Sequence, residues 1–405
     1  MAMARIYLDH SATTPLAPEV EHAMLGALRL CGNPSSLHEE GRRARQAVER
    51  ARAQVAALIG AAPADVCFTS GGTESNSTAL LGLGELAQQQ GRPLHIVTSP
   101  LEHPSVQKPL RRLEARGFVV TELPVDAQGR IDPGALVRVL EERPASVVAL
   151  ALVNHELGNV YPIAQLAALA HARGAWVHCD AVQAAGKLPI DVRGLGVDTL
   201  SLSAHKVYGP KGTGVLYVAG PAQVAGGCGL SLSLPSLLAG GEQERGRRAG
   251  TENVAGIVGL GACADLARQT LLPAVQELAA RRDRLEAGLL SIGGVSTNGD
   301  REQRSPSVCN LRFAEVDGEL LLSSLDLDGI AVSTGAACSS GSSEPSQVLR
   351  ALGQSRSQAK EALRFSLGRG TTDADIEQTI ATVAQVVARI RALGPAPILT
   401  AASAA

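Results

Sequence analysis

The sequence predicts an α/β fold with a large domain, built on a mostly parallel central sheet flanked by helices, and a smaller α+β domain. In the middle of the chain, short apolar runs alternate with helical patterns, as expected of βα units. From about Val254 the pattern changes to long helices rich in Ala, Leu and Arg, followed by short strands around NLRF and LRFSL. A chain of 405 residues, 45% of them hydrophobic, can bury the cores of two such domains.

The first strand of the parallel sheet is predicted from an eight-residue apolar run, SVVALALV, which is continuous enough to be buried on both faces. A helical stretch follows and is ended by a glycine. Further strands are predicted at AWVHCD, DTLSLS and GVLYV. The predicted elements are the strand Ser146–Val153, the helix Ile163–Arg173, and the strands 175–180, Asp198–Ser203 and Gly214–Val218.

The change of pattern near Val254 predicts the domain organisation. We expect a large domain over residues 15–255 and a small domain formed by residues 1–14 together with 256–390. Residues 391–405, which end in an Ala-rich stretch, are expected to form a frayed tail.

Composition and charge exclude several classes of protein. A net charge of −2 gives no electrostatic attraction to nucleic acid or to an anionic membrane. We find no apolar run long enough to span a bilayer and no signal peptide, so we expect a cytoplasmic protein. The seven cysteines lack CxxC pairing, and each is expected to be a buried free thiol unless chemistry says otherwise. No HxxxH or HExxH pattern occurs, so no zinc site is expected.

Polar residues follow several of the predicted strands directly. In an open α/β sheet, ligands bind at the carboxyl ends of the strands, so these side chains are expected to point at one place. The residues in question are Asn154 and His155, Asp180 and Gln183, and Ser203 to Lys206.

The segment FTSGGTES predicts a strand, a glycine turn and a helix that begins at about Glu74. Gly72 and Thr73 lie where free backbone N–H groups and the helix dipole favour a phosphate. No Gly-Lys-Ser/Thr follows, so this is not a nucleotide P-loop. A plain strand–helix junction capped by Thr73 is the alternative.

Lys206, in SLSAHKVYGPKGTG, is the candidate for covalent catalysis on a carbonyl cofactor. Only five of the 37 basic Lys and Arg residues are lysines, which leaves few candidates. Ser203 and His205 could bind a phosphate beside it. The alternative is a surface lysine after an edge strand; Lys211, set in Gly-Pro-Lys-Gly, is interpreted as a turn residue.

Two further residues at strand ends suit a flat, nitrogen-containing ring. Asp180 could pair with a pyridinium nitrogen and make the ring an electron sink, although an Asp there often caps the next helix. His103, in LEHPS, could stack on the cofactor or move protons, although a lone loop histidine is more often without a role.

Cys338 and Arg364 complete the candidate site. Cys338 lies in TGAACSSGSSEPS, among small residues that could carry a thiolate to and from a site. Arg364, in LRFSLGRG, could bind a carboxylate with two parallel hydrogen bonds; its alternative is a surface ion pair.

Taken together, these motifs resemble the cysteine desulfurases of the NifS and IscS type, within the class-V aminotransferases and the fold type I pyridoxal-phosphate enzymes. The match covers about nine-tenths of the chain in the family's order. It rests on the motifs YLDHSATTPLAP, GNPSSLHEEGRRAR, FTSGGTES, VNHELG, DAVQAAGKLPID, SLSAHKVYGPKGTG, RAGTENV and RFSLGRGTT.

The resemblance implies pyridoxal 5′-phosphate as cofactor, L-cysteine as substrate, L-alanine as product and a homodimer. It also implies transfer of sulfur to acceptors such as iron–sulfur cluster scaffold proteins. The resemblance implies that the cofactor is attached to Lys206, that Asp180 binds its ring nitrogen, and that Gln183 and His155 bind its phenolic oxygen. The implied phosphate ligands are Gly72, Thr73, Ser203 and His205, and Thr251 is implied to bind the phosphate of the neighbouring subunit. His103 is implied to stack on the ring and transfer protons, Arg364 to bind the substrate carboxylate, and Cys338 to form the persulfide.

The chain departs from the family pattern in three places. The family usually has Asn where this chain has His155, residues 222–240 are longer than the usual connection, and the C-terminal tail is Ala-rich. Two rival functions are considered. A selenocysteine lyase-like enzyme of the same fold would not need Cys338, and a catalytically inactive sulfur-relay or scaffold subunit would need neither Cys338 nor Lys206.

Overall fold

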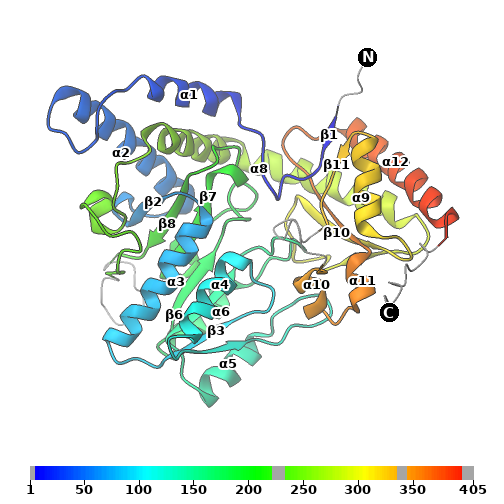
Figure 1. The fold of residues 1–405 in the computed structure, drawn as a ribbon, viewed down its shortest axis with the longest axis horizontal. Helices are drawn as coiled ribbons and strands as arrows, with labels where there is room; N and C mark the ends of the chain where they lie inside the picture. The colour runs from blue at the N-terminus through cyan, green and yellow to red at the C-terminus, as the bar shows by residue number, and fades with distance from the viewer. Residues whose placement is uncertain (1–4, 221–232, 335–343, 395–405) are drawn as a thin grey trace, which may run out of the picture.

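The computed structural model describes residues 5–220, 233–334 and 344–394, without the side chains of 271–273. A large domain built on a central sheet lies on the left of Figure 1, and a smaller domain that holds β1 and α12, the first and last described elements, lies on the right. The long helix α8 (Val254–Leu290) runs between them. The predicted α/β fold is confirmed.

The central sheet of the described residues has seven strands in the order β2-β8-β7-β6-β5-β3-β4. Strand β8 pairs antiparallel with both of its neighbours, and the remaining pairs are parallel, so the sheet is mostly parallel as predicted. The strands are β2 (Val66–Thr69), β3 (His95–Thr98), β4 (Val119–Glu122), β5 (Val147–Ala151), β6 (Trp176–Asp180), β7 (Thr199–Ser203) and β8 (Gly214–Val218).

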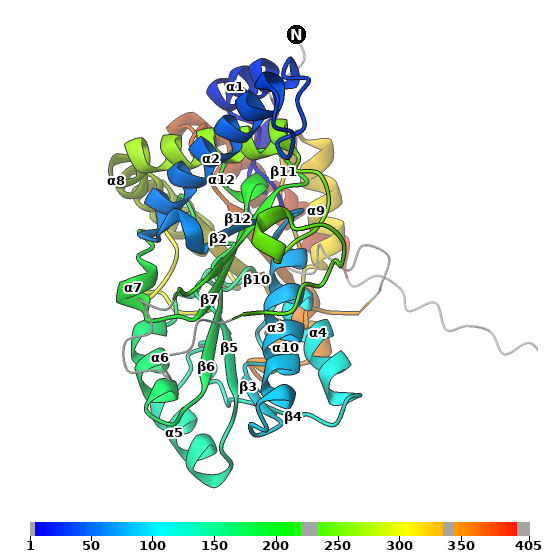
Figure 2. The same ribbon diagram turned by 90° about the vertical axis from the view of Figure 1, so that its left-hand side faces the viewer.

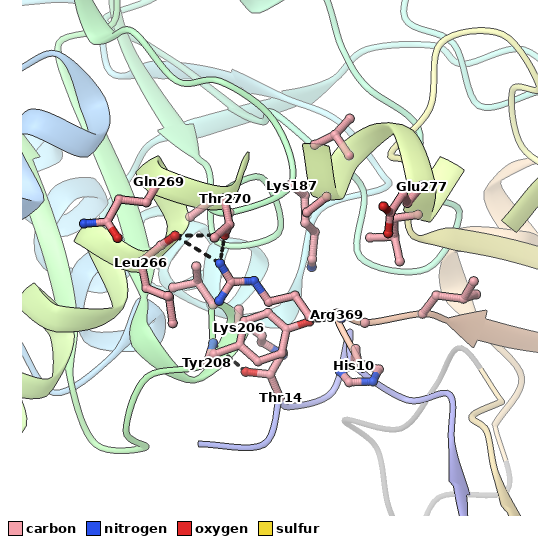
Figure 3. Close-up of a pocket in the computed structure, with 18 of the residues that line it drawn as sticks. His10, Thr14, Lys187, Lys206, Tyr208, Leu266, Gln269, Thr270, Glu277 and Arg369 are labelled. Carbon is pink, nitrogen blue, oxygen red and sulfur yellow. Dashed lines mark hydrogen bonds between the residues drawn. The ribbon is translucent and has the colours of Figure 1, made fainter. Parts of the chain in front are cut away.

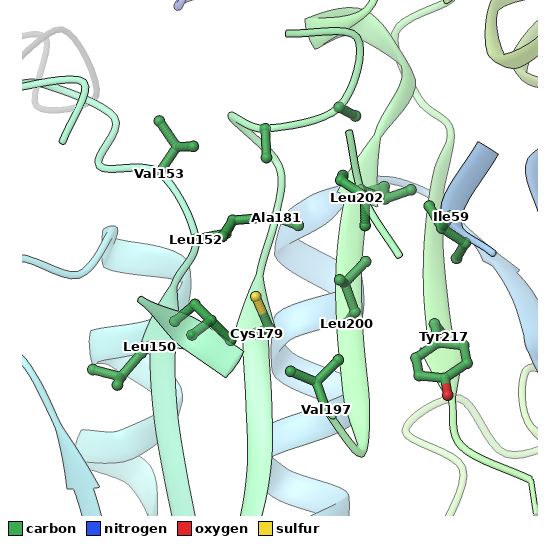
Figure 4. Close-up of a cluster of buried hydrophobic side chains, with 14 of the residues drawn as sticks. Ile59, Leu150, Leu152, Val153, Cys179, Ala181, Val197, Leu200, Leu202 and Tyr217 are labelled. Carbon is green, nitrogen blue, oxygen red and sulfur yellow. The ribbon is translucent and has the colours of Figure 1, made fainter. Parts of the chain in front are cut away.

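Helices cover both faces of this sheet, because its central strands are apolar on both sides. Figure 2 shows α3 (Gly72–Gln89) and α4 (Pro104–Glu114) on one side, and α6 (Ile163–His171) and α7 (Val192–Leu195) on the other. The buried side chains of the second face include Leu150, Cys179, Leu200 and Tyr217 (Figure 4). Three more helices of this domain are α1 (Pro18–Leu28), α2 (Glu39–Ile59) and α5 (Pro133–Glu142).

The small domain contains a three-stranded antiparallel sheet and a two-stranded parallel one. Its core is separate from that of the large domain and includes Leu8, Leu311 and Phe365. The strands are β9 (Val295–Asn298), β10 (Val308–Phe313) and β12 (Ala362–Ser366), and β1 (Ile6–Tyr7) with β11 (Ile330–Ala331). The helices are α9 (Gly318–Leu327), α10 (Gln347–Ala351), α11 (Arg356–Lys360) and α12 (Asp373–Ala392).

The N-terminal segment crosses from the small domain to the large one. The His10 amide donates to the carbonyl of Ser366, at the end of β12, and the Thr14 amide donates to the carbonyl of His205, after β7. This crossing places residues 11–13 over the ends of the central strands.

Two sequence predictions need correction. The helix predicted from about Glu74 begins two residues earlier, at Gly72, because the glycine turn itself enters the first helical turn. Cys31 was expected to be a buried thiol but is exposed, since it follows the end of α1 rather than lying inside an element. The other described cysteines, at positions 67, 179, 263 and 309, are buried and unpaired. No helix among the described residues is long and apolar enough to cross a membrane.

Candidate active site

The polar residues predicted to meet do so at the carboxyl ends of β6 and β7. Asp180 is the last residue of β6 and Ser203 the last of β7. A short 3-10 helix, η2 (Ala204–Lys206), continues directly from β7 and carries the lysine. Asp180 lies beside Ser201 in the parallel register of these strands, so the two strand ends open onto the same edge of the sheet.

Lys206 is held by the N-terminal segment. Its Nζ donates to the carbonyl of Ser11 at 2.6 Å and to that of Ala12 at 2.8 Å. Lys206 is partly buried and follows β7, an inner strand of the sheet, so the alternative of a surface lysine after an edge strand is wrong. Sequence reasoning missed Ser11 and Ala12 because they act through backbone carbonyls, which any residue type would supply.

Asp180 accepts hydrogen bonds with both carboxylate oxygens. The Asn76 amide donates to Oδ2 at 2.8 Å, and the backbone N–H of Val182 donates to Oδ1 at 3.0 Å. Asn76 lies on α3, is fully buried, and also donates to Ser105. Sequence reasoning missed Asn76. A carboxylate that retains acceptor capacity beside these bonds can still pair with a protonated ring nitrogen.

The start of α3 forms an anion-binding cradle. Gly71 has φ of 154°, and a Cβ on Gly214 would meet the Gly71 backbone at 2.5 Å, so both positions require glycine. A Cβ on Gly72 would lie 3.6 Å from Ser203, which shows how closely the helix start approaches the end of β7. The free N–H groups of an 18-residue helix thus lie beside a serine hydroxyl, an arrangement that suits phosphate.

His205 lies next to this cradle, and its Nδ1 is 3.1 Å from the Thr13 hydroxyl. Burial, followed by the charges of Lys206 and two other lysines, lowers the pKa of His205 to about 4. The ring is therefore neutral near pH 7, with one nitrogen able to donate a hydrogen bond.

His103 caps the start of α4. Its Nδ1 lies 3.1 Å from the Ser105 amide nitrogen and 2.8 Å from the Ser105 hydroxyl oxygen, so Ser105 engages this nitrogen in either tautomer of the ring. Burial lowers the pKa of His103. The negative charge of Asp180 raises this pKa, and the positive charge of Lys206 lowers it further.

His155 packs its ring against that of His103. The ring centroids are 5.0 Å apart and the planes meet at 84°. Burial holds the pKa of His155 well below its usual range, and the charges of His103 and Arg364 add to this effect. Burial of His155 therefore favours its neutral form.

Arg364 is 3% exposed and lies on β12. Its guanidinium donates to Asp9 Oδ1 and to the carbonyl of His155, both at 2.8 Å. The alternative of a surface ion pair is wrong, because Arg364 is buried and Asp9 is partly buried. Within the described residues, the Nε of Arg364 has no hydrogen-bond partner, so its N–H can donate to a ligand.

Two residues predicted for the site, Cys338 and Thr251, stay predictions. Cys338 lies outside the described residues, as does most of the 222–240 segment. Thr251 is exposed, and its predicted role concerns a neighbouring subunit, so it stays a prediction.

The residues that flank the Cys338 segment are anchored at the site. Ser333 pairs with Arg364 through both backbone groups, at 2.7 and 3.2 Å. On the other side, the Ser346 hydroxyl donates to Glu156 at 2.5 Å, one residue after His155. Residues 335–343 therefore connect two points of the candidate site.

Two buried ionisable residues beside the site were not predicted. Burial raises the pKa of Glu102 to about 8, and Asp180 adds to this effect. Gln183, which was predicted, donates to the Ser11 carbonyl at 2.9 Å and accepts from the unpredicted Lys187 at 2.8 Å. Lys187 was detectable in principle, because lysines are so rare in this chain.

These residues fit a phosphate-bearing ring with an amine-reactive carbonyl. The glycine cradle beside Ser203 suits the phosphate, the carboxylate of Asp180 suits a ring nitrogen, and the Lys206 amine suits the carbonyl carbon. Among the described residues, no cluster of His, Cys, Asp and Glu could hold a metal ion.

Comparison with known proteins identifies relatives along nearly the whole chain. Residues 6–379 match the family model described as aminotransferase class-V. A cysteine desulfurase IscS of Dictyoglomus turgidum is 42% identical over 96% of both chains. A solved NifS-like protein has a TM-score of 0.86 and 31% identity over 95% of this chain and 100% of its own. The structure of SspA in complex with cysteine has a TM-score of 0.76 and 32% identity, covering 89% of this chain and 98% of its own.

Proposed function

This chain belongs to the class-V aminotransferase family, among its cysteine desulfurases, and we propose that it converts L-cysteine to L-alanine and transfers the sulfur to Cys338. Pyridoxal 5′-phosphate is the proposed cofactor. When bound, it supplies the electron sink that allows the bonds at the substrate's α-carbon to be broken. The residues described above perform the binding, the orientation and the proton transfers.

The cofactor is proposed to attach to Nζ of Lys206, with its phosphate at Gly72, Thr73, Ser203 and His205. Asp180 pairs with the ring nitrogen, and the hydrogen bond from Asn76 keeps that carboxylate in place. Gln183 and His155 bind the phenolic oxygen region, and Thr251 reaches the phosphate of the neighbouring subunit. The homodimer and a cytoplasmic location remain predictions.

The substrate residues have separate tasks. Arg364 binds the carboxylate of L-cysteine. This role is supported by its Nε, which has no hydrogen-bond partner among the described residues. His103 stacks on the ring and moves protons through Nε2, because its Nδ1 is occupied by Ser105. The thiolate of Cys338 attacks the substrate sulfur. A sulfur–sulfur bond forms, the carbon–sulfur bond breaks, and a proton added at carbon gives L-alanine.

The observation that carries this proposal is the anchoring of residues 333 and 346. Ser333 is paired with Arg364 and Ser346 with Glu156, so the intervening segment starts and ends where the substrate carboxylate is expected to bind. Twelve residues, 334–345, lie between these anchors, and twelve extended residues span about 40 Å, which is long enough for a thiol among them to reach substrate in the site. The acceptor is proposed to be a protein of the iron–sulfur scaffold type.

The test is incubation with L-cysteine, followed by alanine measurement and intact-mass analysis. We expect alanine together with a mass increase of about 32 Da per sulfur atom on the wild-type chain. Cys338→Ala should lose the adduct, whereas Cys31→Ala, which removes an exposed thiol that follows α1, should keep it. An adduct that persists in Cys338→Ala contradicts the proposal.

The same experiment separates the rival functions. A selenocysteine lyase-like enzyme should retain turnover of selenocysteine in Cys338→Ala, because it does not need the thiol. An inactive relay or scaffold subunit should bind no pyridoxal phosphate and show no visible cofactor absorbance. Lys206, Asp180, His103 and the buried contacts around them favour the enzyme.

A further inference from the structure

Lys187 is a buried lysine one turn after Gln183. It is 7% exposed, although lysines are almost never buried without a partner. Within the described residues its ammonium makes one hydrogen bond, to Oε1 of Gln183 at 2.8 Å, and no ion pair. A methionine would fill the same space at lower cost, so this position calls for a functional explanation.

Lys187 stands at the end of a chain of hydrogen bonds that leads to Lys206. The other end of the Gln183 amide, Nε2, donates to the carbonyl of Ser11 at 2.9 Å. The same carbonyl accepts from Nζ of Lys206 at 2.6 Å. The two lysines are thus linked through one amide and one backbone carbonyl.

These contacts determine which way the Gln183 amide faces. A charged lysine can only donate, and a backbone carbonyl can only accept. The oxygen of the amide must therefore face Lys187 and its nitrogen must face Ser11. The nitrogen carries two hydrogens, of which the Ser11 carbonyl uses one, so the second is available to a ligand oxygen.

Lys187 and Lys206 also line one cavity. It has a volume of about 440 Å³ and lies between the large domain, α8 and the small domain. Figure 3 shows the Lys187 side chain entering from above, with its nitrogen directed toward the middle of this space. Other charged or titratable groups that line the cavity are His10, Glu19, Tyr208, Glu277, Arg281 and Arg369.

We propose that Lys187 is a positioning residue that fixes the Gln183 amide so that its nitrogen, and not its oxygen, faces the phenolic oxygen of the cofactor. This inference rests on the proposed function. Without Lys187 the amide is held only at its nitrogen, by the Ser11 carbonyl, so the amide plane can swing and the hydrogen bond from that nitrogen to the phenolic oxygen weakens. Burial, Lys206 and Arg364 lower the pKa of Lys187 to about 7, so the amine also changes charge in the neutral range.

The test uses the cofactor-loaded enzyme and three variants. Lys187→Met removes the donor, Lys187→Arg retains a donor for which the adjoining cavity leaves room, and Lys360→Met removes an exposed lysine of the small domain as a control. The first readout is the pH at which the visible absorbance of the bound cofactor changes. The second is the separate effect on kcat and KM for L-cysteine.

We expect Lys187→Met to shift the spectral midpoint by about one pH unit and to lower kcat about tenfold, with KM within about twofold. Lys187→Arg should restore most of both, and Lys360→Met should change neither. In the background of Gln183→Leu, Lys187→Met should add no further spectral shift, because the lysine acts through that amide.

An unshifted midpoint in Lys187→Met, additive shifts in the double variant, or a Lys187→Arg variant that behaves like Lys187→Met would each overturn the proposal. Failure of the proposed desulfurase function can be distinguished from failure of the proposed role of Lys187. In that case the wild-type chain makes no alanine, while the spectrum of the bound cofactor still reports on Lys187.

Discussion

The imidazole rings of His103 and His155 meet edge to face, with centroids 5.0 Å apart and an interplanar angle of 84°. One ring caps α4 and the other follows β5, so the contact joins two of the strand ends that form the site. At position 155 the family usually has Asn, with an amide side chain. In this chain His155 supplies a second aromatic ring beside His103. This contact restricts the orientation of the His103 ring.

His155→Asn restores the family's usual residue. We expect the His103 ring of this variant to stay in place but to be less restricted in its orientation. An aromatic pair contributes about 0.5–1.5 kcal/mol beyond its buried area, so kcat should fall about two- to tenfold if ring orientation limits the proton transfer. Steady-state kinetics with L-cysteine measure the effect. His155→Phe retains the edge-to-face packing but removes the bond that His155 is proposed to make to the phenolic oxygen, so it measures that bond separately. An unchanged kcat in His155→Asn would contradict a packing role.

The pH dependence of the reaction should report on His103. As the neutral ring accepts the proton, activity is lost when His103 becomes protonated. Burial lowers the pKa of His103, so the acid limb of kcat/KM should lie below the ordinary histidine value of about 6.5. The profile of the wild-type chain, measured from pH 5 to 9, checks this. His103→Gln should lower kcat about a hundredfold and abolish the limb; a limb above pH 7 would rule out the assignment.

The central sheet was predictable because buried parallel strands have a plain sequence pattern. The strand predicted over Asp198–Ser203 is β7 within one residue, and Gly214–Val218 is β8. The pattern could not show that β8 runs antiparallel, since strand direction depends on the connection and not on apolar character.

The candidate site was predictable only where side-chain chemistry is specific. Lys206 and Asp180 were found because an amine or a carboxylate at a strand end suggests covalent or acid–base chemistry. The Ser11 carbonyl was missed, because its role depends on the N-terminal segment crossing between domains. Asn76 was missed because a buried amide on a helix face resembles any other helical residue until the fold places it against Asp180.

A buried ion pair between Arg52 and Glu244, which precedes Thr251 in the chain, should contribute to the free energy of unfolding. Arg52 contacts both carboxylate oxygens of Glu244, at 2.6 and 2.7 Å, and the Phe68 amide donates to the same carboxylate at 2.8 Å. Breaking a buried pair leaves one charge uncompensated, so Glu244→Gln should lower the free energy of unfolding by about 3–5 kcal/mol. Denaturant unfolding measures this. Glu39→Gln removes one partner of the exposed Arg43 pair and should cost less than about 1 kcal/mol.

Lys187→Met should make the cofactor-free protein more stable, and the gain should depend on pH. The pKa of Lys187 is about 7 in the folded chain, against 10.5 for an ordinary lysine, so the unfolded chain binds more protons between these values. The wild-type chain therefore gains stability as pH rises from 7 to 10.5, and the penalty of burying the cation is complete below pH 7. Replacing the amine removes that penalty and one hydrogen bond.

The expected gain from Lys187→Met is about 1–3 kcal/mol in the free energy of unfolding at pH 6–7, falling toward zero or below by pH 10. Most of the penalty is gone at pH 10, and above pH 10.5 the wild-type amine is neutral in both states, so only its lost hydrogen bond distinguishes the two chains. Denaturant unfolding at pH 6, 8 and 10 gives the three differences. A loss of stability at every pH would show that Lys187 is retained for the fold. A gain at pH 6 joined to a lower kcat is the result expected of a residue retained for function.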